Sequence, residues 1–352
     1  MDYSTIKALL ICFGCSFWGF ISCTRNDDEE SIAKKTKHQF LSRYISFEEE
    51  FRIGESKNRD KYTFAKIVDI KVGLNGDIFV LDEMDLTIKV FDSRGNFKKS
   101  IGRKGSGPGE MQLPSGISLD SKGKLLLGDR ILNRITIFKE NGDFEGTIKL
   151  RDFPSFHKIA ISTAENFYLT SLHGGWIIHK FNMDGVLRNS FCKAYPDNNL
   201  LIQDFFINGV LCVGRNDSVY YFPDGENEIR VFNNAGILIE TLVRIGEYTP
   251  IKYEKLASGG VQFSFAEGFR HFSFPVSLHI HPRGILISQL GHGDSRSDPR
   301  KVVTEIHYII NKASYTISDS LPTIGNIDPN GNVYCFQNYP IPQVIKFSTI
   351  VH

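Results

Sequence analysis

The stretch Gly76-Asp-Ile-Phe-Val-Leu-Asp82 decides the fold, because a stretch of the same pattern, Gly123-Lys-Leu-Leu-Leu-Gly-Asp129, follows it in the same register. Both copies continue through a second apolar strand and a glycine turn: Thr87-Ile-Lys-Val-Phe-Asp92 and Gly95-Asn96-Phe97, then Arg134-Ile-Thr-Ile-Phe-Lys139 and Gly142-Asp143-Phe144. Self-similarity at a period of about 45 residues, built from short strands and turns, is typical of a β-propeller. The sequence therefore predicts one all-β domain.

The same strand and turn pattern yields six units along the chain. Asn75-Gly76 forms the first hairpin, because glycine readily adopts the positive φ that a tight hairpin turn needs. The expected elements are strands Ile67–Val72, Asp77–Asp82, Thr87–Asp92 and Phe97–Gly102 in the first unit, then units at 117–150, 157–193, 204–243, 273–320 and 323–348. In the fourth unit, turns are predicted at Asn208-Gly209 and Ala235-Gly236. We expect an all-β, six-bladed β-propeller.

Two further patterns concern how the blades close and pack. The sixth unit has three strands, so Ile45–Ile53 is expected to complete it as an N-terminal outer strand beside Gln343–Ser348. A phenylalanine ends the third strand of five units, and we expect this stripe to be core: Phe91, Phe138, Phe181, Phe232 and Phe347.

The composition suits a strand-rich globular protein. The 352 residues are 41% apolar and include 28 Phe and 13 Tyr, which fill pleated, half-buried surfaces. The formal net charge of +1 provides no overall field that would attract nucleic acid or an anionic membrane. A nucleic-acid partner is therefore not expected.

The six cysteines do not form a disulfide framework. Three of them lie within the first 23 residues, and the other three, Cys192, Cys212 and Cys335, are far apart and odd in number. Cys212 and Cys335 lie in apolar runs, so buried free thiols are expected.

The N-terminus has the pattern of an export signal. An apolar stretch of signal-peptide length follows Lys7 and ends in Phe20-Ile-Ser-Cys23, which resembles a bacterial lipobox with Cys23 as the acylated residue. An ordinary signal peptide or an N-terminal anchor is the alternative. The acidic run Asp27–Glu30 resembles the surface-export signal of some Gram-negative lipoproteins, or is a solvated charge run. The expected organisation is a signal peptide at 1–22, a flexible tether at 23–40 and a propeller at 41–352.

A family resemblance follows from these motifs. Gly105-Ser-Gly-Pro-Gly-Glu110, Leu113-Pro114, Gly116-Ile-Ser-Leu-Asp120 and Arg134-Ile-Thr-Ile-Phe138 resemble an NHL-type repeat. With its lipobox, the chain resembles the 6-bladed β-propeller lipoproteins of certain gut-type Gram-negative bacteria. The resemblance implies a fold and a location: the outer membrane, facing the cell surface, or alternatively the periplasm. It leaves the activity open, because members of such families act as binders, scaffolds, lactonases or lyases.

The candidate catalytic or metal-binding residues are few. Asp82 and Asp129 end strands and are expected to accept hydrogen bonds from loop amides. His279 and His281 share one face of a strand and could begin a metal site, although structural histidines are the favoured interpretation. A lactonase would need ligands at the ring axis, where inner strands offer three carboxylates: Asp69, Asp120 and Asp328. We expect no cofactor and no resident metal.

The loops on one face are expected to carry basic and aromatic residues, and Trp176 follows Gly174-Gly175 in one of them. Trp176 could stack on a sugar or peptide, or fill a gap between blades. The candidate ligand-binding residues are Arg103, Arg130, His173, Trp176, Arg215 and His271. The function that fits best is a lipid-anchored binding or assembly module for an extracellular glycan or protein. A lactonase-like hydrolase or lyase acting at the central channel is the alternative, and whether the protein is an enzyme stays open with binding favoured.

Overall fold

The structure is a computed structural model that describes residues 45–54, 60–150, 153, 156–162, 165–197, 199–214, 217–244, 248, 251–265, 272–293, 301–308, 313–317 and 321–351. The expected signal peptide and tether, including Cys23, lie outside these residues. None of the described helices is long and apolar enough to cross a membrane.

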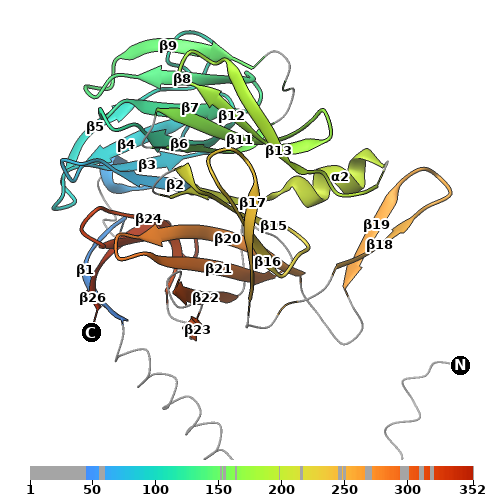
Figure 1. Cartoon of the computed structure of the whole chain (residues 1–352). Coiled ribbons are helices and arrows are strands. Elements are labelled where there is room, and N and C mark those ends of the chain that lie inside the picture. The colour runs from blue at the N-terminus through green and yellow to red at the C-terminus, as the bar shows by residue number, and fades with distance from the viewer. Residues whose placement is uncertain are drawn as a thin grey trace, which may run out of the picture.

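Six four-stranded antiparallel sheets form the blades of a propeller (Figure 1). In order from the inner to the outer strand, blade one is β2 (Ile67–Val72), β3 (Ile78–Asp82), β4 (Thr87–Phe91) and β5 (Phe97–Ile101), and blade two is β6 (Pro114–Leu119), β7 (Leu125–Asp129), β8 (Arg134–Phe138) and β9 (Phe144–Lys149). Blade three is β10 (Phe156–Ile161), β11 (Asn166–His173), β12 (Trp176–Asn182) and β13 (Leu187–Lys193), and blade four is β14 (Gly209–Val213), β15 (Val219–Pro223), β16 (Glu228–Phe232) and β17 (Leu238–Val243). Blade five is β20 (Phe272–His281), β21 (Ile285–Gly293), β22 (Lys301–Tyr308) and β23 (Ala313–Ile317), and blade six is β24 (Thr323–Ile327), β25 (Val333–Gln337), β26 (Gln343–Val351) and β1 (Ile45–Ile53).

The inner strands form a closed ring, since each contacts the inner strand of the next blade and β24 contacts β2. The remaining described elements are a short 3-10 helix (Asp60–Tyr62), α2 (Leu200–Ile207), and the hairpin of β18 (Ile251–Lys255) and β19 (Val261–Phe265). The predicted six-bladed fold is therefore confirmed.

The ring is closed by the N-terminal strand, as predicted. β1 pairs antiparallel with β26, from Ile45 opposite Val351 to Ile53 opposite Val344. Ile53 is buried with the core of blade one, so the closure also contributes apolar burial. Because β1 is far from β26 in sequence, the two ends of the propeller hold each other in place.

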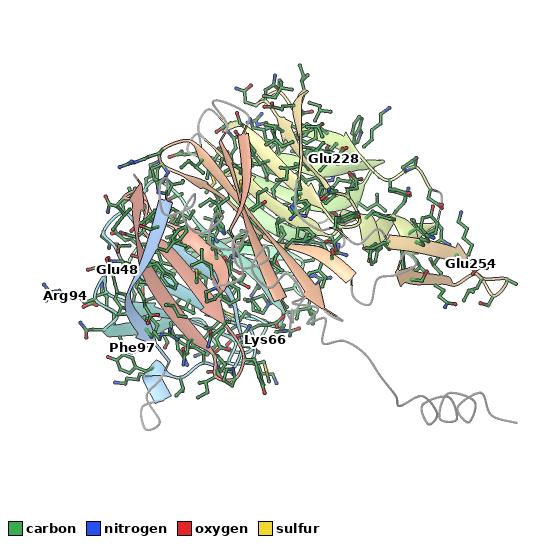
Figure 2. The ribbon with its side chains drawn as sticks, turned by 90° about the horizontal axis from the view of Figure 1, so that it is seen from below. Glu48, Lys66, Arg94, Phe97, Glu228 and Glu254 are labelled. Atoms are coloured by element: carbon green, nitrogen blue, oxygen red, sulfur yellow. The ribbon has the colours of Figure 1, made fainter. Side chains whose placement is uncertain are left out.

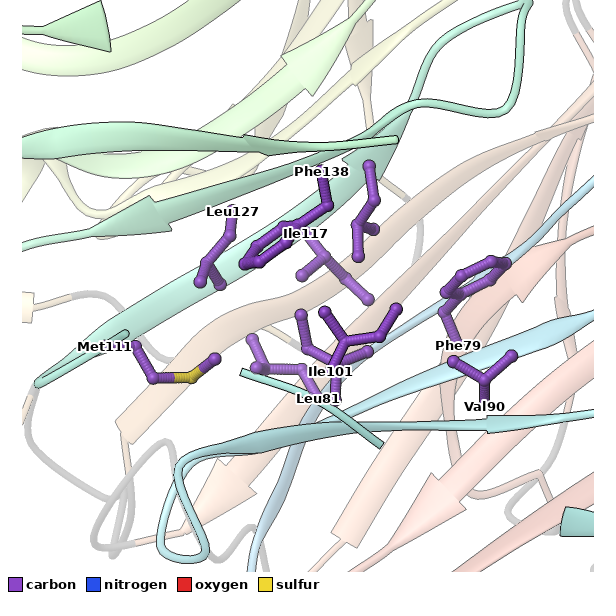
Figure 3. Packing of buried hydrophobic residues seen from close by; sticks show 10 residues of the cluster. Phe79, Leu81, Val90, Ile101, Met111, Ile117, Leu127 and Phe138 are labelled. Carbon is purple, nitrogen blue, oxygen red and sulfur yellow. The ribbon is translucent and has the colours of Figure 1, made fainter. Parts of the chain in front are cut away.

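The core lies between neighbouring blades. Phe91, Phe138, Phe181 and Phe232 are buried, and Phe347 is partly buried against a core cluster, so the predicted stripe is core. Between blades one and two, Leu81 and Ile101 meet Ile117 and Leu127 across the interface (Figure 3). The predicted free thiols are also found: Cys192 and Cys335 are buried, and Cys212 is half-buried.

One part of the sequence interpretation is wrong. The fourth unit was expected to begin with a strand at Asp204 and to turn at Asn208-Gly209. Residues 200–207 instead form the helix α2, and Gly209 opens the inner strand β14. The Ala235-Gly236 turn is present, with φ of +77° at Gly236.

The two faces of the ring carry different connections. Loops from the second to the third strand of a blade, and from the fourth strand to the next blade, emerge on one face, here called the upper face. The other connections lie on the lower face. Since β1 is a fourth strand, it runs from the lower to the upper face, and Ile45 lies at the lower face beside Val351.

Removing residues 1–54 should unfold or aggregate the protein, whereas removing residues 1–37 should leave its melting temperature unchanged. The longer deletion exposes the edge of β26 and removes Ile53, a buried side chain whose burial contributes about 1.5–3 kcal/mol. Thermal melts of the two truncations check this expectation. Equal melting temperatures would show that β1 does not support the ring.

Candidate functional site

Two insertions distinguish the upper face. The helix α2 lies in the connection from blade three to blade four, and the hairpin β18–β19 lies in the connection from blade four to blade five. In Figure 1 both stand at the same side of the ring, and in Figure 2 Glu254 of the hairpin lies far out from the blades. Long insertions on a rigid scaffold are common places for binding residues.

The helix α2 is short and depends on its caps and its packing. The Asn199 side chain accepts a hydrogen bond from the Leu201 N–H at 2.9 Å, which caps the N-terminus. Eight residues are too few for a stable isolated helix. Burial of Ile202 and Phe206 therefore holds α2 on the ring, and His157 of β10 lies 3.5 Å from the Asp204 carboxylate.

An aromatic cluster joins the helix to the hairpin. Phe205 of α2 stacks on Phe263 of β19 with ring centroids 4.2 Å apart, and Tyr195 stacks on Phe206 at 4.1 Å. Tyr253 of β18 lies 6.3 Å from Phe206 and from Phe263. We call these five residues the aromatic cluster. Its rings are half-buried except for Phe206, so their edges form part of the surface.

A polar contact fixes the same junction. The Lys255 ammonium lies 2.9 Å from the Asp197 carboxylate, and the Tyr253 hydroxyl donates to Asp197 at 3.3 Å. The Asn199 N–H and the Lys255 ammonium lower the pKa of Asp197 below its ordinary value. Asp197 therefore stays ionised at neutral pH and holds the hairpin against the chain that leads into α2.

The turn Asp224–Asn227 of blade four lies beneath the helix. Gly225 has φ of +73°, and a Cβ atom there would lie 2.2 Å from the Phe206 ring. Only glycine fits at this position without displacing α2, for reasons of both space and backbone conformation.

Charged side chains gather beside this turn. Arg230 contacts the Glu226 carboxylate at 2.5 Å and lies 3.5 Å from the Cys192 sulfur of blade three. Burial raises the pKa of Glu226, although the Arg230 charge opposes the shift, and burial also raises the pKa of the Cys192 thiol. On the same turn, Asn227 lies 3.3 Å from the buried Arg244 guanidinium. The sequence interpretation missed this group because it placed the blade-four strands incorrectly.

The predicted ligand-binding residues fall on two parts of the upper face. Arg103 is exposed and pairs with Glu110 at 2.9 Å, and Arg130 is exposed in the next upper loop of blade two. His173 and Trp176 pair across the hairpin of blade three, and Trp176 is half-buried as the first residue of β12. Arg215 and His271 lie outside the described residues.

His173 belongs to a packed aromatic group. Its ring lies 4.4 Å from Phe153, whose own ring lies 4.8 Å from His179. Burial lowers the pKa of His179 to about 4, so its imidazole is neutral at physiological pH. His173 therefore rests on a neutral, buried support.

Three polar side chains of the inner strands, Asp69, Lys71 and His279, lie at contacts with backbone or charged groups. Asp69 of β2 accepts hydrogen bonds from the Lys71 ammonium at 2.6 Å and from the Ile117 N–H of blade two at 3.0 Å. His279 of β20 donates from Nε2 to the Ile324 carbonyl at 2.9 Å. Burial and the Lys71 charge lower the pKa of His279 to about 4. These groups tie neighbouring inner strands to one another.

The strand-end aspartates have the predicted structural role. Asp82 accepts hydrogen bonds from the Ala65, Lys66 and Asp85 amides, and Asp129 accepts from Gln112, Leu113 and Leu132. Gln289, inside β21 of blade five, has a different role, since it accepts from the Ile324 N–H of β24 in blade six at 2.6 Å.

The two other inner carboxylates are turn formers. Asp120 and Asp328 each accept amide hydrogen bonds within their own turns, from Lys122 and from Asn330. Among the described residues, no group of three or more His, Cys, Asp and Glu side chains could hold a metal ion.

Comparisons with known proteins agree with this fold. The model of a protein family described as "6-bladed beta-propeller" matches residues 26–174. The predicted resemblance to six-bladed propellers is thereby confirmed, whereas the lipobox and the NHL-type repeat remain predictions. A 45-residue segment is 42% identical to protein lin-41 of Caenorhabditis elegans, and the match covers 13% of this chain and 4% of that protein.

Solved structures resemble the whole ring at low sequence identity. A Bacteroides fragilis protein described as exported is 13% identical, with a TM-score of 0.60 over 88% of this chain and 95% of that one. A DUF4221 family member from Bacteroides vulgatus is 8% identical, with a TM-score of 0.57 over 88% and 99%. A streptogramin B lyase is 12% identical, with a TM-score of 0.50 over 87% and 98%. At these identities the likeness concerns the fold alone.

Phe263→Ala should loosen the hairpin without unfolding the ring. An aromatic pair contributes about 0.5–1.5 kcal/mol beyond its buried area, and the Phe263 ring meets Phe205 of α2 and Tyr253 of the hairpin. Amide exchange in β18 and β19 should therefore quicken about tenfold, while exchange in the inner strands stays unchanged. The control is Gln262→Ala, which alters the exposed side of the same strand. Unchanged exchange in the Phe263 variant would show that the cluster does not hold the hairpin.

Proposed function

We propose that this protein is an exported, lipid-anchored β-propeller that binds an extracellular glycan or protein through its upper face. The observation that carries the proposal is the joining of two insertions, α2 and the hairpin, by the aromatic cluster on that face. Insertions that only connected blades would need neither stacked rings nor the Asp197–Lys255 ion pair.

The upper face combines the side chains that binding sites favour. Aromatic rings and arginines dominate binding energy at protein interfaces, and here half-buried rings lie beside exposed leucines of the helix. Leu200 is 70% and Leu201 is 56% exposed, on a helix whose other side is buried. Arg130 and Trp176 extend this surface across blades two and three.

The start of β1 supports binding through the upper face. Ile45 lies at the lower face, so a tether from an acylated Cys23 would join the ring on the side opposite the insertions. An anchor on that side leaves the upper face uncovered by the attachment point. The structural likeness to an exported protein fits the same location.

An enzymatic function at the ring axis is the second candidate. The inner strands carry a carboxylate, an ammonium and a neutral imidazole, which favour this candidate: Asp69, Lys71 and His279. Turnover of a lactone or a streptogramin B by the purified protein, abolished by His279→Ala, would support it.

Cys23→Ala should release the protein from the membrane fraction and abolish its labelling with a lipid precursor. The attached acyl chains supply the membrane affinity, at about 0.8 kcal/mol for each buried CH₂ group. Fractionation of cells without detergent is the measurement. Retention of the variant in the membrane would indicate an uncleaved apolar segment instead.

Trp176→Ala together with Arg130→Ala should weaken binding to the ligand identified on a glycan array or by pull-down. Loss of a central aromatic contact costs about 2 kcal/mol, or roughly thirtyfold in affinity. Surface changes usually alter stability by only about 0.5 kcal/mol. Titration and thermal melting of the same samples separate the two effects.

The matched control changes the opposite face. Leu74 is 78% exposed on the lower face, so Leu74→Asp should leave affinity unchanged, whereas Leu200→Asp on α2 should reduce it. Equal losses for the two leucine variants would contradict binding through the upper face. A large fall in melting temperature for Trp176→Ala would identify Trp176 as core.

A further inference from the structure

The outer strand of blade four differs from its counterparts in blades one, two, three and six. The repeat aligns these strands residue by residue, because Phe91, Phe138, Phe181 and Phe232 pair with the first residue of β5, β9, β13 and β17 respectively. At the next position stand the exposed charges Lys98, Glu145 and Arg188 in blades one to three, but Ile239 in blade four. The outer strand of blade six carries Glu48, Glu49 and Glu50.

Ile239 stands where blades one to three carry a charge, and it extends an exposed apolar edge on β17. Leu238, Ile239 and Val243 are 51%, 56% and 61% exposed, and Ile237, just before the strand, is 61% exposed. Natural proteins place charges on outer strands to prevent edge-to-edge pairing, and blades one to three follow that rule. The register shift between the third and the outer strand, near the start of the outer strand, recurs in blades one to four. It therefore does not distinguish β17.

The backbone of β17 is available at the same edge. No described strand pairs with its outer side, since β17 ends the sheet order of blade four. The Arg244 N–H donates to the Asn227 carbonyl at 3.1 Å, which makes this pair a hydrogen-bonded one. Pairs alternate along an antiparallel ladder, so the N–H and C=O groups of Thr241 and Val243 point to the free edge.

We propose that β17 is a self-association edge, on which β17 of a second copy of this chain pairs antiparallel with Thr241 opposite Thr241. The two blades then form one continuous eight-stranded sheet across a twofold axis. Because the same edge is used by both copies, the assembly closes as a dimer and does not extend into a filament.

The charge of Glu240 favours the register in which Thr241 lies opposite Thr241. Centring the pair on Thr241 places Ile239 opposite Val243 and Glu240 opposite Leu242. Centring it one residue earlier would place Glu240 opposite Glu240, and like charges directly opposite are unfavourable. Thr241 also exchanges its two outward hydrogen bonds with its own copy. A strand of another protein would not need this self-complementary sequence.

The arrangement of the dimer is compatible with anchoring. Antiparallel pairing turns the upper faces in opposite directions. The chain from Cys23 to Ile45 can span at most about 70 Å, which exceeds the length of about 20 Å that β17 covers from one face of the ring to the other. Both copies can therefore be attached to one membrane.

Thr241→Cys tests the register in the full-length protein, expressed in cells that export it. Opposed residues of a hydrogen-bonded antiparallel pair have Cα atoms about 5.5 Å apart, within the disulfide range of about 4.4–6.8 Å. Mild oxidation should convert most of the variant to a disulfide-linked dimer on a non-reducing gel. The matched control is Ser100→Cys, the equivalent exposed position of β5 beside Lys98, and it should stay monomeric. Equal cross-linking of the two variants, or none in either, would overturn the proposal.

Ile239→Lys tests the association without cross-linking. It restores the charge found at Lys98 and should convert the dimer to a monomer in sedimentation of the full chain carrying Cys23→Ala. Leu200→Lys, the same kind of change on α2, should leave the dimer intact. A monomeric parent protein would refute self-association. Co-sedimentation of that parent with phosphatidylethanolamine and phosphatidylglycerol vesicles, lost in Ile239→Lys, would instead assign the apolar edge to a lipid surface. Neither assay depends on ligand binding by the upper face.

Discussion

Pairing of β1 with β26 is the constraint on which the ring depends. The inner strands contact one another around a circle, but only β1 supplies the fourth strand of blade six. Its register, from Ile45 with Val351 to Ile53 with Val344, brings together segments separated by nearly the whole chain. Such a contact is costly in loop entropy and is repaid by apolar burial at Ile53 and Val344. The rigid circle of blades follows from this single closure.

Within that circle, polar side chains at the ends of second strands fix the upper loops. Asp82 and Asp129 hold backbone amides on both sides of their strands. The chemical requirement is an acceptor that reaches several loop N–H groups, and a carboxylate meets it with two oxygens. The loops are thereby fixed before any ligand arrives, which reduces the entropy lost on binding.

Local periodicity explains how much of the structure the sequence could predict. The stripe of Phe91 and its equivalents, the Asn75-Gly76 turn and the closing strand were all predictable, because each depends on short-range pattern or on an unpaired edge. The helix α2 was not, since residues 200–207 are almost uniformly apolar and Asn208-Gly209 imitates a hairpin turn. The Asp224–Asn227 turn and the aromatic cluster were missed for that reason. They depend on tertiary contacts between Phe206, Gly225 and Phe263 that no local pattern contains.

The places where the repeat loses its regularity are informative about function. Blades one and two keep the strand-end aspartates, the turn glycines and charged outer strands. Blade three keeps the charge but not the aspartate, and blade four keeps neither, and these departures coincide with α2, the hairpin and the apolar strand β17. Stability alone does not require an exposed isoleucine at position 239, where blades one to three carry Lys98, Glu145 and Arg188. The internal repeat supplies the comparison that singles out this exposed position, and the proposed pairing of two β17 strands gives it a role.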